Sequence, residues 1–148
     1  MFLVFFSLVY ALVTYGVIMA AQQSINYAAE EGARRVLVWA SDRPTRAGAA
    51  LNLASSISAW MTGSGGSSAL QIAVCDYSGA LASSNAGAAA LCNGQVSGGN
   101  ADQVAVVVRY LYQAFPLVPF LPGVGFLVPN ALAAQASVQL MDSIGQGK

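Results

Sequence analysis

The hydrophobic pattern is most pronounced at the start of the chain, in residues 1–21. This stretch, MFLVFFSLVYALVTYGVIMAA, contains no charged residue, no proline and one glycine. A helix of this length is about 30 Å long, which matches the hydrocarbon core of a bilayer. The core helix of a water-soluble protein would normally show a polar stripe, and this stretch has none. The pattern therefore predicts a helix that spends part of its life in lipid.

The following residues, up to about Ala40, continue the helical pattern but become amphipathic. Glu30 and Glu31 are followed four positions later by Arg34 and Arg35, which predicts two i,i+4 ion pairs. Apolar and small residues recur at spacings of three and four: Ile25, Ala28, Ala29, Gly32, Ala33, Val36 and Leu37. We expect one helix of about 60 Å from near Met1, with its second half lying on a globular domain.

Small residues also stand four positions apart along this helix. The pairs are Gly16 with Ala20, Ala28 with Gly32, and Ala29 with Ala33. Such pairs let two helix backbones approach closely, as in membranes. The alternative is that alanine is simply common in this chain.

A shorter second helix is predicted after Ser41 or Asp42, either of which can cap it, with Pro44 in the first turn. One face is apolar and contains Ala47, Ala50, Leu51, Ala54, Ile57 and Met61, with Trp60 beside it. Gly63 is the expected stop. Residues 63–68 are rich in glycine and serine but lack the GK[ST] ending of a phosphate-binding loop, so we interpret them as a linker.

Three later segments predict β-strands: residues 69–76, 103–112 and 131–141. The second is the strongest because it is rich in β-branched and aromatic residues, and the third should return beside it as in a hairpin. In the first, Leu70, Ile72 and Val74 should share a face; in the second, Val104, Val106, Val108 and Tyr110 should share one. Residues 77–100 are expected to form a loop, with a short strand near Leu91 and Cys92 as an option. The fold class is thus α+β, with two helices and a small antiparallel sheet.

Residues 114–129, AFPLVPFLPGVGFLVP, are hydrophobic enough to suggest a second membrane span. Four prolines, however, exclude a regular helix, and irregular backbone does not face lipid. We expect a proline-stiffened connection that packs on its own domain or on a neighbour. The last residues, 142–148, are expected to be mobile.

Composition restricts the partners of the chain. The formal net charge is zero, and only 8% of the 148 residues are charged, against about a quarter in typical domains. Little repulsion therefore keeps identical copies apart, which favours lipid or an assembly as the environment. The chain offers no basic patch for a nucleic acid, so no nucleic-acid partner is expected.

The two cysteines, Cys75 and Cys92, lie in a region rich in glycine, serine and alanine. The chain has no histidine, and Asp76 is the only carboxylate near them, so no metal site is expected. A disulfide is the simpler interpretation, with free thiols as the alternative. It would contribute about 3 kcal/mol in the chain-entropy model and would indicate an oxidising compartment.

The order of these features resembles the TadE-like pilins and pseudopilins, relatives of type IV pilins from tight-adherence (Flp) systems. The resemblance rests on Tyr15-Gly16 at the end of the span, on Gln22-Gln23, and above all on residues 28–34, AAEEGAR, which are similar to the family's AAxEGAR. The valine-rich strand, the proline-studded connection and the final strand also follow the family's order. The resemblance covers nearly the whole chain.

One part of the family's pattern is not matched. Family members carry a basic leader, a glycine-type cleavage point and a glutamate just before the apolar run, whereas the first glutamate here is Glu30. Leader processing, and pairing of an early glutamate with a neighbour's amino terminus, are therefore not carried over.

The resemblance implies a structural subunit that waits in the inner membrane and then polymerises into an extracellular pilus. Residues 1–40 would form the filament core and residues 41–148 the head, with identical subunits, the inner-membrane assembly machinery and the bilayer as partners. The expected assembly residues are Phe2, Phe5, Phe6, Tyr10, Tyr15, Gly16, Ala20, Glu30, Glu31, Arg34, Arg35, Phe115, Phe120 and Phe126. For the four charges, ordinary pairs within the helix are the competing explanation.

The alternative is a minor TadE-like pseudopilin that primes or tips a pilus made of another protein. An enzyme is not expected, because histidine is absent and Asp76, Asp102 and Asp142 are scattered. The serines also lack a G-x-S-x-G elbow. We therefore expect no catalytic residues and no cofactor.

Overall fold

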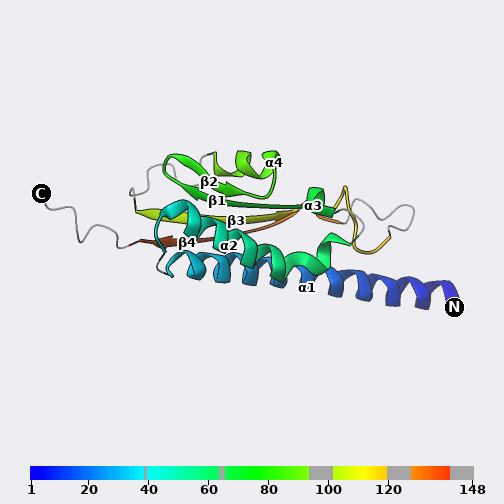
Figure 1. The fold of residues 1–148 in the computed structure, drawn as a ribbon. Coiled ribbons are helices and arrows are strands. Elements are labelled where there is room, and N and C mark those ends of the chain that lie inside the picture. Colours follow the sequence, from blue (N-terminus) through cyan, green and yellow to red (C-terminus); the bar gives the residue numbers. More distant parts are fainter. Residues whose placement is uncertain (39, 64–65, 94–101, 120–127, 141–148) are drawn as a thin grey trace, which may run out of the picture.

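The computed structural model describes residues 1–38, 40–63, 66–93, 102–119 and 128–140. It is an α+β fold with a long helix, a second helix and a four-stranded antiparallel sheet, as predicted. The two helices cover one face of the sheet, and a short helical segment covers the other (Figure 1).

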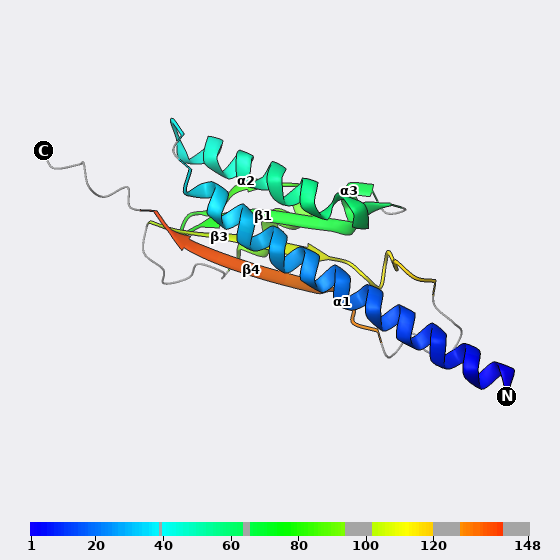
Figure 2. The same cartoon turned by 90° about the horizontal axis from the view of Figure 1, so that it is seen from below.

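The long helix α1 (Phe2–Val36) begins where the apolar run begins. It ends short of the predicted Ala40, because the N–H groups of Leu37 and Val38 bond the carbonyls of Arg34 and Arg35 in a tightened last turn. Its C-terminal half packs on the sheet and on the second helix. There it buries a stripe of mostly small residues: Ala21, Ile25, Ala28, Ala29, Gly32, Ala33 and Val36. Its N-terminal half projects beyond the sheet, at the end of the molecule opposite the C-terminal end of the last strand (Figures 1 and 2).

The second helix α2 (Arg43–Ser58) starts at the predicted cap. Asp42 accepts a hydrogen bond from the Thr45 N–H, and Pro44 occupies the first turn. The chain then tightens into the 3₁₀ turn η1 (Ala59–Thr62) and reaches Gly63, the predicted stop. The buried apolar residues of α2 and η1, Ala47, Ala50, Ala54 and Met61, belong to the apolar face predicted from the sequence, and Ser58 of α2 is buried as well.

The sheet has the strand order β2-β1-β3-β4, with every neighbour antiparallel. Its strands are β1 (Leu70–Asp76), β2 (Gly79–Ser83), β3 (Gln103–Tyr110) and β4 (Leu132–Gln139). The predicted pairing of the last two is confirmed, with Val106 opposite Ala136. The face assignments are also confirmed, since Ile72, Val74 and Val108 pack with the helices while Ala73, Ala105 and Val107 face the other side.

The prediction of a loop over residues 77–100 was wrong for its first part. Residues 79–83 form β2, and α4 (Ala86–Ala89) with the 3₁₀ turn η2 (Ala90–Cys92) lies over the outer face of the sheet. Leu91 and Cys92 are thus helical rather than a strand. The β1–β2 turn is closed by Asp76, whose Oδ1 accepts from the Ser78 and Gly79 N–H groups at 2.8 and 3.0 Å. Gly79 has a φ of 133°, which favours glycine.

Part of the expected linker is also ordered into the helical turn α3 (Gly66–Ala69). Residues 64–65 of that linker, residues 120–127 of the proline-rich connection and the tail 142–148 lie outside the described residues.

Candidate assembly surface

The N-terminal half of α1 presents an apolar surface that the rest of the molecule leaves open. Its most hydrophobic stretch of 18 residues has a mean hydropathy of 2.2, and none of these residues is buried. The exposed large side chains are Met1, Phe2, Leu3, Val4, Phe5, Phe6, Leu8, Val9, Leu12, Val13, Tyr15 and Met19. By length and composition α1 is able to cross a membrane. We call residues 1–20, which are Met1 and the first part of α1, the bare half.

The two aliphatic hydroxyls of the bare half bond within the helix. Ser7 Oγ donates to the Leu3 carbonyl, and Thr14 Oγ1 donates to the Tyr10 carbonyl, both at 2.8 Å. This i−4 bonding satisfies each hydroxyl without water. The bare half can therefore enter an apolar environment without leaving these groups unpaired.

Predicted assembly residues in this half lie at the surface. Phe2, Phe6 and Tyr10 stack along one line of the helix, with ring centroids 6.3 and 6.4 Å apart. Phe5 and Tyr15 are exposed elsewhere on the helix. Gly16 and Ala20 are also exposed, and a Cβ added to Gly16 would meet no heavy atom within 4 Å. This small-residue pair therefore lies on an open surface.

The other small residues of α1 are used inside the head. A Cβ on Gly32 would lie 3.2 Å from Val106 Cγ1 and 3.5 Å from Ala54 Cβ. Gly32 therefore marks the closest approach of α1 to both α2 and β3. The small-residue spacing around Gly32 thus has an explanation within the chain, whereas no residue that the structure describes packs closely on Gly16.

The charged cluster at the end of α1 forms one ion pair among the described residues. Arg34 contacts Glu31 at 3.5 Å with i,i+3 spacing, in place of the two predicted i,i+4 pairs. Both spacings bring side chains to the same face of a helix, so the shift is a choice between neighbouring partners. Glu30 and Arg35 form no ion pair with any residue that the structure describes, and both are exposed.

The start of the proline-rich connection is held by two tyrosine hydroxyls, which the sequence did not indicate. Tyr110 donates to the Phe115 carbonyl at 2.7 Å, and Tyr10 donates to the Pro119 carbonyl. The fully buried Tyr112 packs its ring edge against Tyr110, with ring centroids 6.2 Å apart. Tyr10 belongs to α1, Tyr110 ends β3, and Tyr112 follows β3 by two residues. Only the folded chain brings these tyrosines together.

Burial affects the chemistry of two of these tyrosines. Desolvation raises the pKa of Tyr110 and of Tyr112 above the ordinary value of 10.0. Both hydroxyls therefore keep their protons at physiological pH. As a result they remain polar but uncharged next to the apolar connection.

The described part of the connection packs on its own domain. Phe115, Leu117 and Val128 are partly buried against the core between the helices and the sheet. Phe115 is therefore only partly available to a neighbour. Phe120 and Phe126, the other two aromatic assembly candidates here, lie outside the described residues.

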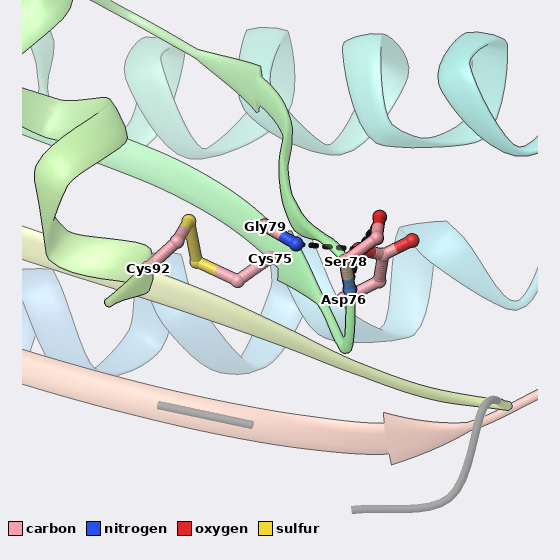
Figure 3. Close-up of a disulfide and its surroundings, with 5 residues drawn as sticks. All are labelled: Cys75, Asp76, Ser78, Gly79 and Cys92. Atoms are coloured by element: carbon pink, nitrogen blue, oxygen red, sulfur yellow. Dashed lines mark hydrogen bonds between the residues drawn. A yellow bond between two sulfur atoms is a disulfide. The ribbon is translucent and has the colours of Figure 1, made fainter. Parts of the chain in front are cut away.

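Cys75 of β1 and Cys92 of η2 form a disulfide with a Cα–Cα distance of 5.3 Å (Figure 3). It fastens α4 and η2 to the outer face of the sheet, next to the turn that Asp76 closes. Cys75 is fully buried, and Cys92 is nearly so. Together with Ala73, Ala88, Ala105 and Val107, this cystine forms a second small core.

The described residues contain little that resembles a catalytic site. Among them, no three His, Cys, Asp or Glu side chains cluster closely enough to hold a metal ion. A cavity of about 240 Å³ lies beside the end of α2 and is lined by Ser55, Ala59, Thr62, Gly66, Leu70, Ile72 and Ser84. None of these lining residues is charged or a base.

A comparison with protein families finds a match over the part of the chain that contains the bare half and the AAEEGAR segment. The family model described as TadE-like protein matches residues 1–34, which end with the last residue of that segment. No curated protein and no solved structure matches the chain. The first 34 residues, and with them nearly all of α1, are therefore similar to the TadE-like family, which is related to pili.

Proposed function

We propose that this protein is a pilin, a structural subunit that polymerises into a Tad-type extracellular pilus through α1. The observation that carries the proposal is the division of α1 into two halves. The second half is fixed to the head by Ile25, Gly32 and Val36, whereas the bare half has an exposed apolar surface. The TadE-like match over residues 1–34 supports the same assignment.

Such a surface is unfavourable in water, because each large apolar side chain gains about 1.5–3 kcal/mol when it is buried. Two environments can cover it on all sides: acyl chains, or the bare halves of other copies. The first suits a subunit that waits in the inner membrane, and the second suits the core of a filament. Extraction into a filament then exchanges one apolar environment for another.

The head also has features that suit this role. Its disulfide is typical of a compartment outside the cytoplasm. The zero net charge of the chain adds little repulsion between neighbouring copies. The exposed Glu30 and Arg35 are candidates for ion pairs between subunits. The proposed partners are identical subunits, the inner-membrane assembly machinery and, before assembly, the lipid bilayer.

The test is imaging of filaments sheared from cells, with mass spectrometry of the filament band. We expect this chain to be the dominant component of the filaments. Gly16→Leu should abolish filaments while leaving the protein in the membrane, because it fills the open small-residue position but keeps the helix apolar. Gly48→Leu is the matched control, since a Cβ at Gly48 of α2 also meets nothing within 4 Å.

A minor TadE-like pseudopilin that primes or tips a pilus made of another protein is the alternative. Abundance separates the two roles, because a tip protein would be nearly absent from sheared material. If filaments form normally without this chain, or if Gly16→Leu leaves them unchanged, the proposed role of the bare half is wrong.

A further inference from the structure

The proline-rich connection reaches the bare half of α1. The Tyr10 hydroxyl donates to the Pro119 carbonyl, although the two residues are 109 positions apart in the sequence. The segment after β3 therefore leaves the sheet at the end where α1 projects and lies beside that projecting helix (Figures 1 and 2).

The position of Tyr10 along α1 indicates how deep in a bilayer this contact would lie. Tyr10 precedes Ala21, a fully buried residue of α1, by 11 positions, or about 16 Å of helix axis. One leaflet of a bilayer contributes about 15 Å of hydrocarbon. If the bare half spans the membrane and the head stays in water, Pro119 cannot remain in water while it contacts Tyr10.

Irregular backbone is tolerated at membrane depth only where its polar groups are satisfied by protein. Residues 114–119 meet this condition in part. Pro116 and Pro119 have no N–H group, and the Phe115 N–H donates to the Leu111 carbonyl at 3.0 Å. The hydroxyls of Tyr110 and Tyr10 donate to the carbonyls of Phe115 and Pro119, respectively.

We propose that residues 114–119 enter the head-side leaflet beside α1, with phospholipid acyl chains as their partner. The segment, AFPLVP, has no charged or polar side chain. The inference rests on the proposed function, since it assumes that α1 is the membrane anchor.

A second copy of the chain is the competing occupant of this surface. Lipid is favoured because the depth of Tyr10 along α1 places the contacting Pro119 within the bilayer for as long as the bare half spans the membrane. The apolar surface of the segment is also continuous with that of the bare half through the Tyr10 contact.

The test uses the full chain in phosphatidylcholine vesicles, with Trp39 and Trp60 replaced by phenylalanine and single tryptophans introduced. Leu117→Trp reports on the connection, and Val118→Trp is a second reporter in case the first disturbs packing. Leu12→Trp on the bare half is the positive control. Tyr77→Trp, at the exposed turn between β1 and β2, is the control in water. The measurement is quenching by phospholipids that carry bromine on their acyl chains.

We expect Leu117→Trp or Val118→Trp to lose as large a fraction of its fluorescence as Leu12→Trp, while Tyr77→Trp stays unquenched. Adding Tyr10→Phe should reduce the quenching at the connection and leave that of Leu12→Trp unchanged. If Leu12→Trp is quenched and both connection reporters are not, the segment stays out of lipid and the inference is overturned. Protection of those reporters that increases with protein density would assign the surface to a second copy and would also overturn it. Absence of quenching at Leu12→Trp would instead refute the membrane anchor in the proposed function.

Discussion

At the scale of single residues, the packing around Gly32 explains why the AAEEGAR segment needs a small residue at this position. It lies where α1 meets both α2 and β3, with Val106 and Ala54 as its nearest side-chain neighbours. Any larger side chain must displace a packed neighbour. The requirement is therefore set by the fold of one subunit and applies before any assembly.

Replacing Gly32 with valine should lower the free energy of unfolding of the head by about 1–3 kcal/mol relative to Gly48→Val, because it overpacks the contact between α1, α2 and β3. Both variants place the same β-branched residue in a helix, so their intrinsic helix propensities cancel. Urea unfolding of the two chains in detergent micelles checks this. Equal stabilities would show that Gly32 has no special packing role.

The disulfide is the other residue-scale feature with a measurable contribution. The double variant Cys75→Ala/Cys92→Ala should be less stable than the native chain by about 3 kcal/mol, since its unfolded state is no longer cross-linked. Denaturant titration with and without reductant measures the difference. Reductant should destabilise the native chain by a similar amount and leave the double variant unchanged. A native chain that is insensitive to reductant would contradict the prediction.

At the scale of elements, the start of α2 depends on the carboxylate of Asp42. Hydrogen bonds from Ser41, and then from Thr45, lower the pKa of Asp42 below its ordinary value of 3.8. The folded state thus favours the charged form. The resulting stabilisation is complete above that ordinary pKa and is lost as the pH falls below it.

Asp42→Asn should therefore be less stable than the native chain at neutral pH, and the difference should shrink as the pH falls from about 5 through 3.8 and below. Asparagine also caps helices, so the comparison isolates the charge. Thermal unfolding across this pH range is the measurement. A difference that stays constant down to the lowest pH would show that the charge of Asp42 does not contribute.

The elements that could be predicted from the sequence are those with strong local signals. The alternation in β1, β3 and β4, the cap at Asp42 and the uncharged run of α1 each indicate their element directly. Strand β2 was missed because its five residues, GALAS, include four small ones and little to bury. The turn that precedes it, Asp-Tyr-Ser-Gly, was an available signal, because Asp and Gly at these positions are typical of a β-turn.

The candidate surface was only partly predictable for a different reason. The exposure of the bare half follows from its composition, since an uncharged run of this length exceeds what a small head can cover. The roles of Tyr10, Tyr110 and Tyr112 depend on contacts between segments far apart in the sequence, which no local pattern encodes. The shift of the Arg34 ion pair to Glu31 is instead a choice between two partners on the same helix face, which the sequence pattern does not decide.

At the scale of the whole molecule, the head and the bare half are expected to behave differently in water. Among the described residues, none of the fully buried core side chains lies in the bare half, and Ile18 near its end packs against the core, partly buried. Removing residues 1–17 should therefore yield a folded, monomeric, water-soluble head whose stability falls by no more than about 1 kcal/mol, from loss of the Tyr10 hydrogen bond. Circular dichroism and size-exclusion chromatography check this. A shortened chain that still self-associates would place the assembly surface elsewhere.

The central claim is that the bare half of α1 exchanges lipid for copies of itself. The most direct measurement is oxidative cross-linking of Gly16→Cys in isolated membranes and in sheared filaments, with Gly48→Cys as the matched control on α2. The account predicts that Gly16→Cys stays largely monomeric in the membrane and forms covalent dimers in filaments, while Gly48→Cys forms none. Filaments that contain this chain but give no cross-link at Gly16→Cys, nor at the neighbouring Ala20→Cys, would contradict it.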